Sequence, residues 1–254
     1  MIIQIYEIQE PESAEKCIEI GIDHIGSVLL SEYDWKKLSV KDVMNVVSDG
    51  NSKSSIIPCF SNPDTISRAV DFYRPNIIHL CETLMDIKGC IDSKALSIAV
   101  SNQYLIKSRF PEFSIMRSIP IPKPGIIEHF KPELIANEFA EISDFFLTDT
   151  WLRNEPVTGF IGITGEQSDI DLVCEFVTSS KVPVILAGGL SPENIYDSII
   201  KANPFGVDSC TLTNKVDNKG KPLRFCKDFE KVMHFKNEVE RAVADTSKLL
   251  HKVE

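Results

Sequence analysis

The amino-acid sequence predicts an α/β fold, a closed (β/α)8 barrel with an extended C-terminal helix. Three observations support this prediction. The chain has 254 residues, which matches the usual size of one such barrel. Short runs of apolar and β-branched residues alternate with amphipathic segments, as expected for parallel βαβ units. The short runs are nearly continuous in apolar residues, which indicates strands covered on both faces.

Eight strands and eight helices follow from this alternation. The predicted strands are Ile2–Tyr6, His24–Leu30, Ser55–Phe60, Ile77–Cys81, Phe113–Ile119, Asp144–Asp149, Pro183–Ala187 and Val207–Thr211. The first helix is expected over Pro11–Gly21, because a proline and an acidic first turn favour a helix start and a glycine favours its end. By the same logic we expect helices over Ser39–Val47, Asn62–Phe72, Ile91–Tyr104, Lys131–Ile142, Ser168–Thr178 and Ser191–Ala202.

The last predicted helix begins near Phe225 and ends at about His251. It carries one apolar stripe: Phe229, Val232, Met233, Val239, Val243, Leu249 and Leu250. We predict one domain over residues 1–254, in which residues 243–254 are a helical extension that is either solvated or an oligomer contact. The sequence leaves open whether the protein is a monomer or a homodimer.

Composition limits the partners and the location. A net charge of −10 argues against nucleic acid and against an anionic membrane surface. No apolar run is long enough to cross a bilayer, and the N-terminus reads as a strand rather than a secretory signal. Seven scattered cysteines without a C-x-x-C spacing predict reduced thiols in a cytoplasmic protein. We expect no metal and no cofactor, because neither a ligand cluster nor a nucleotide fingerprint occurs.

The most informative segment is Pro183–Asn194, in which a buried strand ends at Gly188 and Gly189 and a Ser-Pro-Glu helix start follows. Adjacent glycines expose backbone N–H groups at the positive end of a helix, which suits a phosphate or another small anion. The next strand ends at Thr211, so two consecutive strand ends can share an anion, as the last units of these barrels often do. The loop over residues 159–169, with Thr164 and Gly165, is a second candidate cradle.

Candidate catalytic side chains lie where predicted strands end, the place at which these barrels carry their active sites. Asp149 ends the sixth strand and is a candidate general acid or base; the alternative is an aspartate that only caps a loop. His79 and Cys81 share the end of the fourth strand and one face of it, but no third partner can be named. The roles of two basic residues remain open. Lys36 either closes over an anionic substrate or is solvated, and Arg117 either clamps an anion or pairs with a buried acid.

Together these segments resemble the phosphoribosylanthranilate isomerase family, the (β/α)8 enzymes of the tryptophan pathway. The resemblance covers the chain to about residue 235. It rests on Leu186-Ala-Gly-Gly-Leu-Ser-Pro-Glu-Asn194, Phe146-Leu-Thr-Asp149-Thr150, Gly162-Ile-Thr164-Gly165, Gly206-Val-Asp208 and Gly21-Ile-Asp23-His-Ile-Gly26. It implies an Amadori rearrangement of N-(5′-phosphoribosyl)anthranilate or a similar phosphorylated ribosylamine, without a cofactor. Asp149 takes the position of the family's catalytic acid, which protonates the ring oxygen.

The sequence departs from the family at several functional positions. Tyr6 takes the place of the cysteine that serves as the general base, and a phenol with a reference pKa of about 10 is a poor base at neutral pH. Glu7 is adjacent but faces the other way while the strand persists. Lys36 replaces the arginine that clamps the substrate, and Leu212 replaces a phosphate-loop glycine.

These departures leave three hypotheses. The first is an isomerase of the family type with an unfamiliar base, for which Glu7, His79 and Cys81 are the candidates. The second is a non-catalytic relative that binds a phosphorylated metabolite or a protein partner. The third is a different reaction on another phosphorylated substrate in the same barrel.

Overall fold

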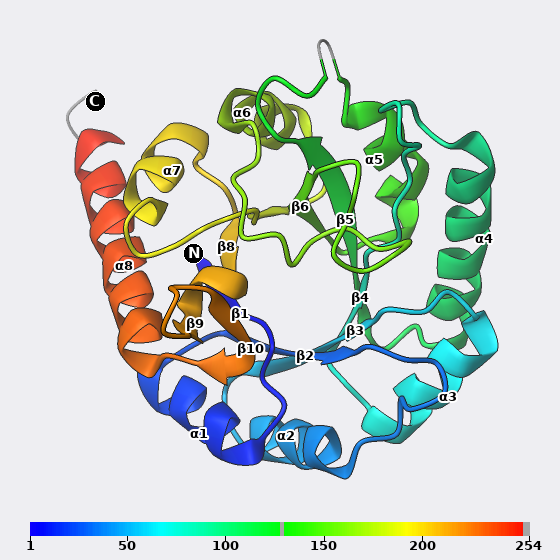
Figure 1. Cartoon of the computed structure of the whole chain (residues 1–254), viewed down its shortest axis with the longest axis horizontal. Coiled ribbons are helices and arrows are strands. Elements are labelled where there is room, and N and C mark those ends of the chain that lie inside the picture. The colour runs from blue at the N-terminus through cyan, green and yellow to red at the C-terminus, as the bar shows by residue number, and fades with distance from the viewer. Residues whose placement is uncertain (128–129, 251–254) are drawn as a thin grey trace.

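The computed structural model describes residues 1–127 and 130–250, and the side chains of residues 249 and 250 are outside that description. Eight parallel strands form a closed barrel in chain order, and helices surround it (Figure 1). The first and last strands close it, with Ile2 paired to Gly206 and Ile5 paired to Ser209. The predicted TIM-barrel fold is confirmed.

All eight predicted strands are present, and their ends differ from the predicted ones by at most three residues. They are β1 (Ile2–Ile5), β2 (His24–Leu29), β3 (Lys53–Pro58), β4 (Ile77–Leu80), β5 (Ser114–Pro122), β6 (Phe145–Trp151), β7 (Val184–Leu186) and β8 (Gly206–Ser209). The helices are α1 (Pro11–Ile20), α2 (Leu38–Ser48), α3 (Pro63–Tyr73), α4 (Ser93–Arg109), α5 (Glu133–Phe139), α6 (Ile170–Ser179), α7 (Ile195–Ala202) and α8 (Phe229–Leu250). Short 3-10 helices lie over Ala140–Ile142 and Thr211–Thr213.

Local chemistry explains several helix ends. Asn62, Asp92 and Asp169 precede α3, α4 and α6, and the side chain of each accepts hydrogen bonds from the first turn of its helix. Gly21 ends α1 with a left-handed φ of 86°, a conformation that glycine adopts without steric cost.

Side chains alternate between the barrel interior and the helix layer. The lower interior is apolar around Ile77, Met116, Leu147 and Ile185. Beside it lies a buried polar group in which Gln4 Nε2 donates to Asp208 Oδ1 at 3.1 Å, and His24 Nδ1 lies 3.2 Å from Gln4 Oε1. This alternation decides which side chains can reach the mouth of the barrel.

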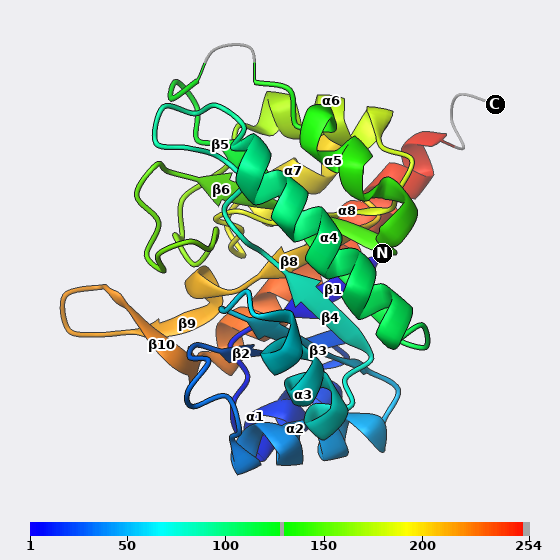
Figure 2. The same cartoon turned by 90° about the vertical axis from the view of Figure 1, so that its right-hand side faces the viewer.

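The segment after β8 contains a hairpin that the sequence analysis did not predict. Strands β9 (Asn214–Val216) and β10 (Pro222–Lys227) pair antiparallel. Figure 2 shows this hairpin projecting beyond the barrel on the same side as the loop after β6. The predicted helix start near Phe225 is therefore wrong. Helix α8 begins at Phe229, because Asp228 accepts hydrogen bonds from the N–H groups of Glu230 and Lys231 and so caps it.

Helix α8 packs on the barrel through Val232, Phe235, Val239 and Ala242. Met233 was predicted in the apolar stripe but is half exposed, so the stripe is narrower than expected. Beyond Ala242, Tyr196 Oη donates to Asp245 Oδ2 at 3.1 Å, which ties the start of the extension to α7. The predicted end at His251 lies outside the described residues. No helix in the described ranges is both long and apolar enough to span a bilayer.

Candidate active site

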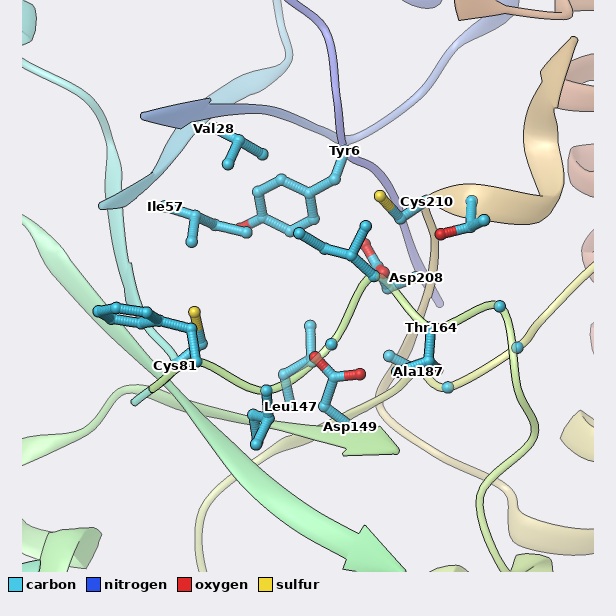
Figure 3. Close-up of a pocket in the computed structure, with 18 of the residues that line it drawn as sticks. Tyr6, Val28, Ile57, Cys81, Leu147, Asp149, Thr164, Ala187, Asp208 and Cys210 are labelled. Carbon is cyan, nitrogen blue, oxygen red and sulfur yellow. The ribbon is translucent and has the colours of Figure 1, made fainter. Parts of the chain in front are cut away.

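A cavity opens at the carboxyl ends of the strands and receives side chains from seven of the eight strand ends (Figure 3). Its wall includes five predicted site residues that are glycines or threonines and four that carry a titratable group. The first five are Gly188, Gly189, Thr164, Gly165 and Thr211, and the other four are His79, Asp149, Tyr6 and Cys81. The described lining contains no lysine and no arginine.

Asp149 points into this cavity from β6 (Figure 3). Its Oδ1 accepts the N–H of Thr150 at 2.9 Å. The loop after β6 folds back over the carboxyl group, and a Cβ added to Gly162 would lie 2.3 Å from Asp149 Oδ2. Burial, followed by the charge of Asp208, raises the pKa of Asp149 from 3.8 to about 8. The carboxyl group therefore holds a proton at neutral pH.

Asp208 is a second carboxylate in the same cavity, contributed by β8. Sequence reasoning used this residue only to match a strand motif and did not identify it as a site residue. Its period-two relation to Cys210 on the same strand was the available signal. Burial raises the pKa of Asp208 to about 7, while the hydrogen bond from Gln4 and the charge of Lys227 lower it. Asp208 therefore ionises more readily than Asp149.

Tyr6 occupies the cavity wall between β1 and the ends of β2 and β3. Its hydroxyl lies 2.6 Å from Ser55 Oγ and 2.9 Å from His79 Nδ1. The ring rests on Gly26, where an added Cβ would lie 2.0 Å from Tyr6 Cε1, so only glycine leaves room for it. Burial raises the pKa of Tyr6 well above its usual range, so the phenol stays protonated.

His79 and Cys81 are also poor bases in this setting. His79 Nε2 lies 2.8 Å from Ser118 Oγ, and burial lowers the pKa of His79 to about 3, so the ring is neutral and fully engaged by two hydroxyl groups. The neighbouring Cys59 thiol, followed by burial, raises the pKa of Cys81 well above its usual range. Neither side chain carries a charge at neutral pH.

The twin glycines line the cavity with backbone that no other residue could provide. Gly188 and Gly189 have φ values of 95° and 62°. A Cβ on Gly188 would lie 2.2 Å from Ser168 Oγ, and one on Gly189 would lie 2.6 Å from the carbonyl carbon of Glu166. The two loops therefore meet through bare backbone, and the structure brings both predicted cradles to one end of the cavity.

The helix start predicted directly after these glycines is wrong. Residues 191–194 form a turn, and α7 begins at Ile195. Asn194 Oδ1 accepts the N–H of Ser191 at 2.9 Å, and Ser191 Oγ accepts the N–H of Glu193 at 3.2 Å. Because the turn satisfies these N–H groups internally, anion binding here depends on the glycine backbone and on Thr164 and Thr211.

Arg117 does not reach the cavity. Its neighbours Met116 and Ser118 face the barrel interior, so Arg117 faces the helix layer. There it is fully buried, donates to Glu82 Oε2 at 2.5 Å and to Gln103 Oε1 at 2.8 Å, and packs on Phe139. Of the two alternatives for Arg117, the structure shows the buried pair.

Lys36 and Glu7 also lie away from the cavity. Lys36 precedes α2, and its Nζ lies 4.7 Å from the centre of the Phe72 ring on α3. Glu7 follows the end of β1, is buried, and accepts hydrogen bonds from Asn214 Nδ2 and Arg224 Nε, each at 2.7 Å. Glu7 thus anchors the β9–β10 hairpin.

Among the described residues, no three or more histidine, cysteine, aspartate or glutamate side chains are arranged to hold a metal ion. The cavity is instead a largely apolar pocket with two carboxyl groups inside and a glycine-lined end. In such a pocket one carboxyl group can donate a proton to a bound molecule and the other can accept one, because their pKa values differ. The glycine end can hold an anion.

Comparison with known proteins gives the family. The family model described as N-(5′phosphoribosyl)anthranilate (PRA) isomerase matches residues 119–236. Among solved structures, phosphoribosyl anthranilate isomerase from Thermotoga maritima aligns with a TM-score of 0.67 at 19% identity, covering 94% of this chain and 99% of that structure. Another structure of this enzyme, in complex with reduced 1-(o-carboxyphenylamino)-1-deoxyribulose 5-phosphate, has a TM-score of 0.65 at 17% identity and the same coverage. These two likenesses show the fold.

Curated relatives are more similar in sequence. N-(5′-phosphoribosyl)anthranilate isomerase of Methanocella arvoryzae is 32% identical over 233 residues, covering 89% of this chain and 95% of the relative. The protein of the same name from Methanosarcina acetivorans is 33% identical over 249 residues, covering 93% of this chain and 92% of the relative. Matches of this identity and coverage extend over the whole barrel, so the chain belongs to the phosphoribosylanthranilate isomerase family.

Proposed function

We propose that this chain is an isomerase that converts N-(5′-phosphoribosyl)anthranilate to its ketose in an Amadori rearrangement, a step of tryptophan biosynthesis. The observation that carries the proposal is the pair of carboxyl groups, Asp149 and Asp208, that face one largely apolar cavity beside a glycine cradle. Family membership supports the reaction. The pair supplies the acid and the base that this reaction requires.

Asp149 is the general acid. It is protonated at neutral pH because burial and the nearby Asp208 raise its pKa to about 8. Transfer of this proton to the ring oxygen breaks the bond between that oxygen and C1, and the nitrogen lone pair forms the Schiff base. The Thr150 N–H that contacts Asp149 then stabilises the resulting carboxylate.

Asp208 takes the proton from C2. The family's cysteine is replaced by Tyr6, whose hydroxyl is hydrogen bonded and protonated. Asp208 faces the same cavity, and the described residues hydrogen bond to only one of its oxygens, so the other can accept a proton. Loss of the C2 proton to Asp208 converts the protonated Schiff base to an enolamine. Protonation at C1 and loss of the proton of the C2 hydroxyl then give the ketose. Tyr6 then shapes the pocket rather than performing proton transfer.

The glycine end of the cavity binds the 5′-phosphate. Gly188, Gly189 and Gly165 offer backbone without Cβ atoms, and Thr164 and Thr211 offer hydroxyl groups. Neutral donors of this kind hold phosphate in many proteins without a cation. The arrangement supports a small phosphorylated substrate even though Leu212 now stands in the wall.

The test is turnover by the purified protein of phosphoribosylanthranilate made from anthranilate and ribose 5-phosphate, with the ketose separated by chromatography. We expect turnover by the wild type and a loss of kcat of about 10²–10⁴-fold in both Asp149→Asn and Asp208→Asn. Asp197→Asn, an exposed aspartate on α7, is the matched control and should keep the wild-type rate.

Other outcomes separate the remaining hypotheses. Thermal stabilisation by sugar phosphates without any isomer formed would identify a non-catalytic relative. Product from a different sugar phosphate, but none from phosphoribosylanthranilate, would identify another reaction in this barrel. Full activity in Asp208→Asn would refute the assignment of the base while leaving the reaction intact.

A further inference from the structure

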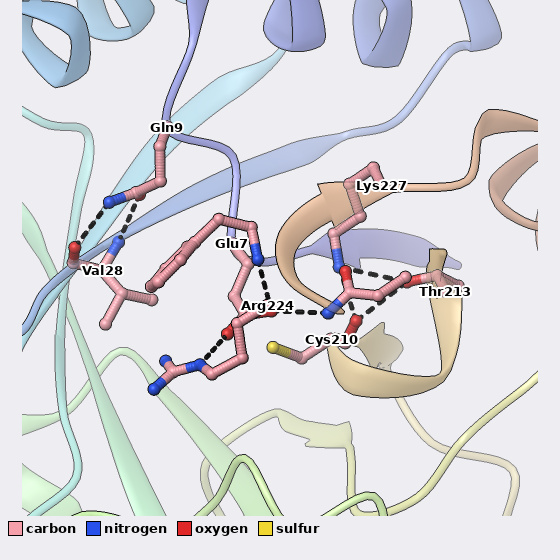
Figure 4. A network of polar contacts seen from close by, with 9 residues as sticks. Glu7, Gln9, Val28, Cys210, Thr213, Arg224 and Lys227 are labelled. Carbon is pink, nitrogen blue, oxygen red and sulfur yellow. Dashed lines mark hydrogen bonds and ion pairs between the residues drawn. The ribbon is translucent and has the colours of Figure 1, made fainter. Parts of the chain in front are cut away.

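The hairpin β9–β10 places Arg224 beside Glu7 and near Cys210, a residue of the cavity wall (Figure 4). Arg224 Nε donates to Glu7 Oε1 at 2.7 Å, and the same carboxylate accepts from Asn214 Nδ2 at 2.7 Å and from the N–H of Phe225 at 3.4 Å (Figure 4). The Glu7 side chain is fully buried, whereas that of Arg224 is 35% exposed. Glu7 therefore fixes the guanidinium through Nε, while part of the Arg224 side chain stays exposed.

One nitrogen of this guanidinium has no partner among the described residues. Arg224 Nη2 is buried and makes no hydrogen bond in that part of the chain. The guanidinium also lies 4.7 Å from the centre of the Phe225 ring, which limits its movement. A buried and unpaired donor on a fixed guanidinium is costly unless an anion pairs with it.

The guanidinium lies close to the cavity wall. It lowers the pKa of Cys59, after the larger effect of Cys81, and it opposes the rise that burial causes in the pKa of Cys210. Both cysteines line the cavity, one from the end of β3 and one from the end of β8. Figure 4 shows Arg224 of the hairpin, Glu7 and Cys210 close together.

The backbone that holds Arg224 is strained at two places. Glu7 and Phe225 both have left-handed φ values, 65° and 63°, although neither is a glycine. Such conformations persist only where the surroundings hold them, and they cluster at ligand-binding sites. Here each strained residue contributes one group to the network around the guanidinium.

We propose that Arg224 binds the carboxylate of the aminobenzoate part of the substrate. The inference rests on the proposed function, because that substrate carries a phosphate at one end and an aromatic carboxylate at the other. The glycine cradle serves the phosphate, and the described lining has no cation for the carboxylate. With Nε bound to Glu7, the two Nη groups of the guanidinium are the donors left for a planar carboxylate. Glu7 is the positioning residue, and Lys36, held on Phe72, has no part in it.

The experiment compares two substrates, N-(5′-phosphoribosyl)anthranilate and N-(5′-phosphoribosyl)aniline, which lacks only the carboxylate. Arg224→Gln should raise KM for the first by about 10- to 100-fold and leave KM for the second unchanged. Arg224→Lys should recover part of the loss, because it restores the charge but not the paired donors. Arg109→Gln, an exposed arginine on α4, is the matched control.

Two results would overturn the inference. An equal rise of KM for both substrates in Arg224→Gln would show that Arg224 only supports the hairpin. A rise of KM in Lys36→Gln, with none in Arg224→Gln, would assign the carboxylate to Lys36. If the wild type turned over neither substrate, the proposed function would fail. Binding of free anthranilate would then decide the inference, because Arg224→Gln must weaken it relative to the wild type; equal binding, or none, would refute it.

Discussion

Replacement of Asp149 by asparagine should stabilise the fold at alkaline pH while it removes the activity. The side chains have the same shape, and the amide oxygen of asparagine can still accept the Thr150 N–H that contacts Oδ1 at 2.9 Å. What changes is the ionisable group. Because the buried carboxyl has a raised pKa, its ionisation opposes folding.

The sign and size of the effect follow from linkage. The pKa is 3.8 in the unfolded chain and about 8 in the folded protein. As pH rises between these values, the unfolded state loses the proton and the folded state keeps it, so the free energy of unfolding falls. At 1.36 kcal/mol per pKa unit the full shift gives an upper bound of about 6 kcal/mol. The carboxyl group retains solvent contact through the cavity and is coupled to Asp208, so we expect roughly 2–3 kcal/mol.

The assay is urea denaturation of the wild type and Asp149→Asn between pH 5.5 and 9. The stability advantage of the variant should grow from pH 5.5 to about pH 8 and then level off, while kcat falls by about 10²–10⁴-fold. Asp42→Asn, an exposed aspartate on α2, should show no such pH-dependent gain. A variant that is less stable than the wild type at pH 8.5 would refute the assignment of a buried, protonated Asp149.

Three further predictions test the same site. The pH profile of kcat/KM should be a narrow bell, falling below about pH 7 as Asp208 gains a proton and above about pH 8 as Asp149 loses one; a flat profile from pH 6 to 9 would contradict the pair. Gly189→Ala should raise KM for phosphorylated substrate and destabilise the fold by about 1–3 kcal/mol in thermal unfolding, because its φ is 62° and its Cβ meets backbone at 2.6 Å. Gly26→Ala should destabilise the fold because its Cβ meets the Tyr6 ring at 2.0 Å, and the added change Tyr6→Ala should partly relieve that loss; simple additivity of the two stability effects would argue against the contact.

The alternation of apolar runs and amphipathic segments predicted the barrel well because each strand and each helix has its own local signal. In the region after β8, the local signals predicted the wrong structure. The apolar spacing from Phe225 onward fits a helix, but Pro222 lacks an N–H, the Phe225 backbone is left-handed and Asp228 caps the helix that follows. The Asp228 cap was visible in the sequence. The hairpin depends on Glu7, which is more than 200 residues away along the chain.

The ends of the predicted strands located the cavity correctly. Whether a given side chain lines the cavity depends on the direction in which that side chain points. Asp149, His79 and Cys81 lie on the inward face of their strands and reach the cavity. Arg117 lies on the outward face of β5, and applying the period of two to its neighbours would have excluded it. Asp208 satisfies the same rule on β8, and it was missed because its motif was used only to locate a strand.

The proposed replacement of the family's base by Tyr6 is consistent with the rest of the cavity. A tyrosine fits at this position because Gly26 leaves space beneath its ring, and its hydroxyl is taken up by Ser55 and His79. Tyr6 and His79 therefore offer no base, and the proposed removal of the C2 proton requires another group that ionises near neutral pH. Among the described lining residues, Asp208 meets that condition, because Gln4 stabilises its charged form while Asp149 remains protonated. Two carboxyl groups in one apolar pocket cannot both ionise cheaply, and the charge of Asp208 raises the pKa of Asp149, as the proposed acid and base require.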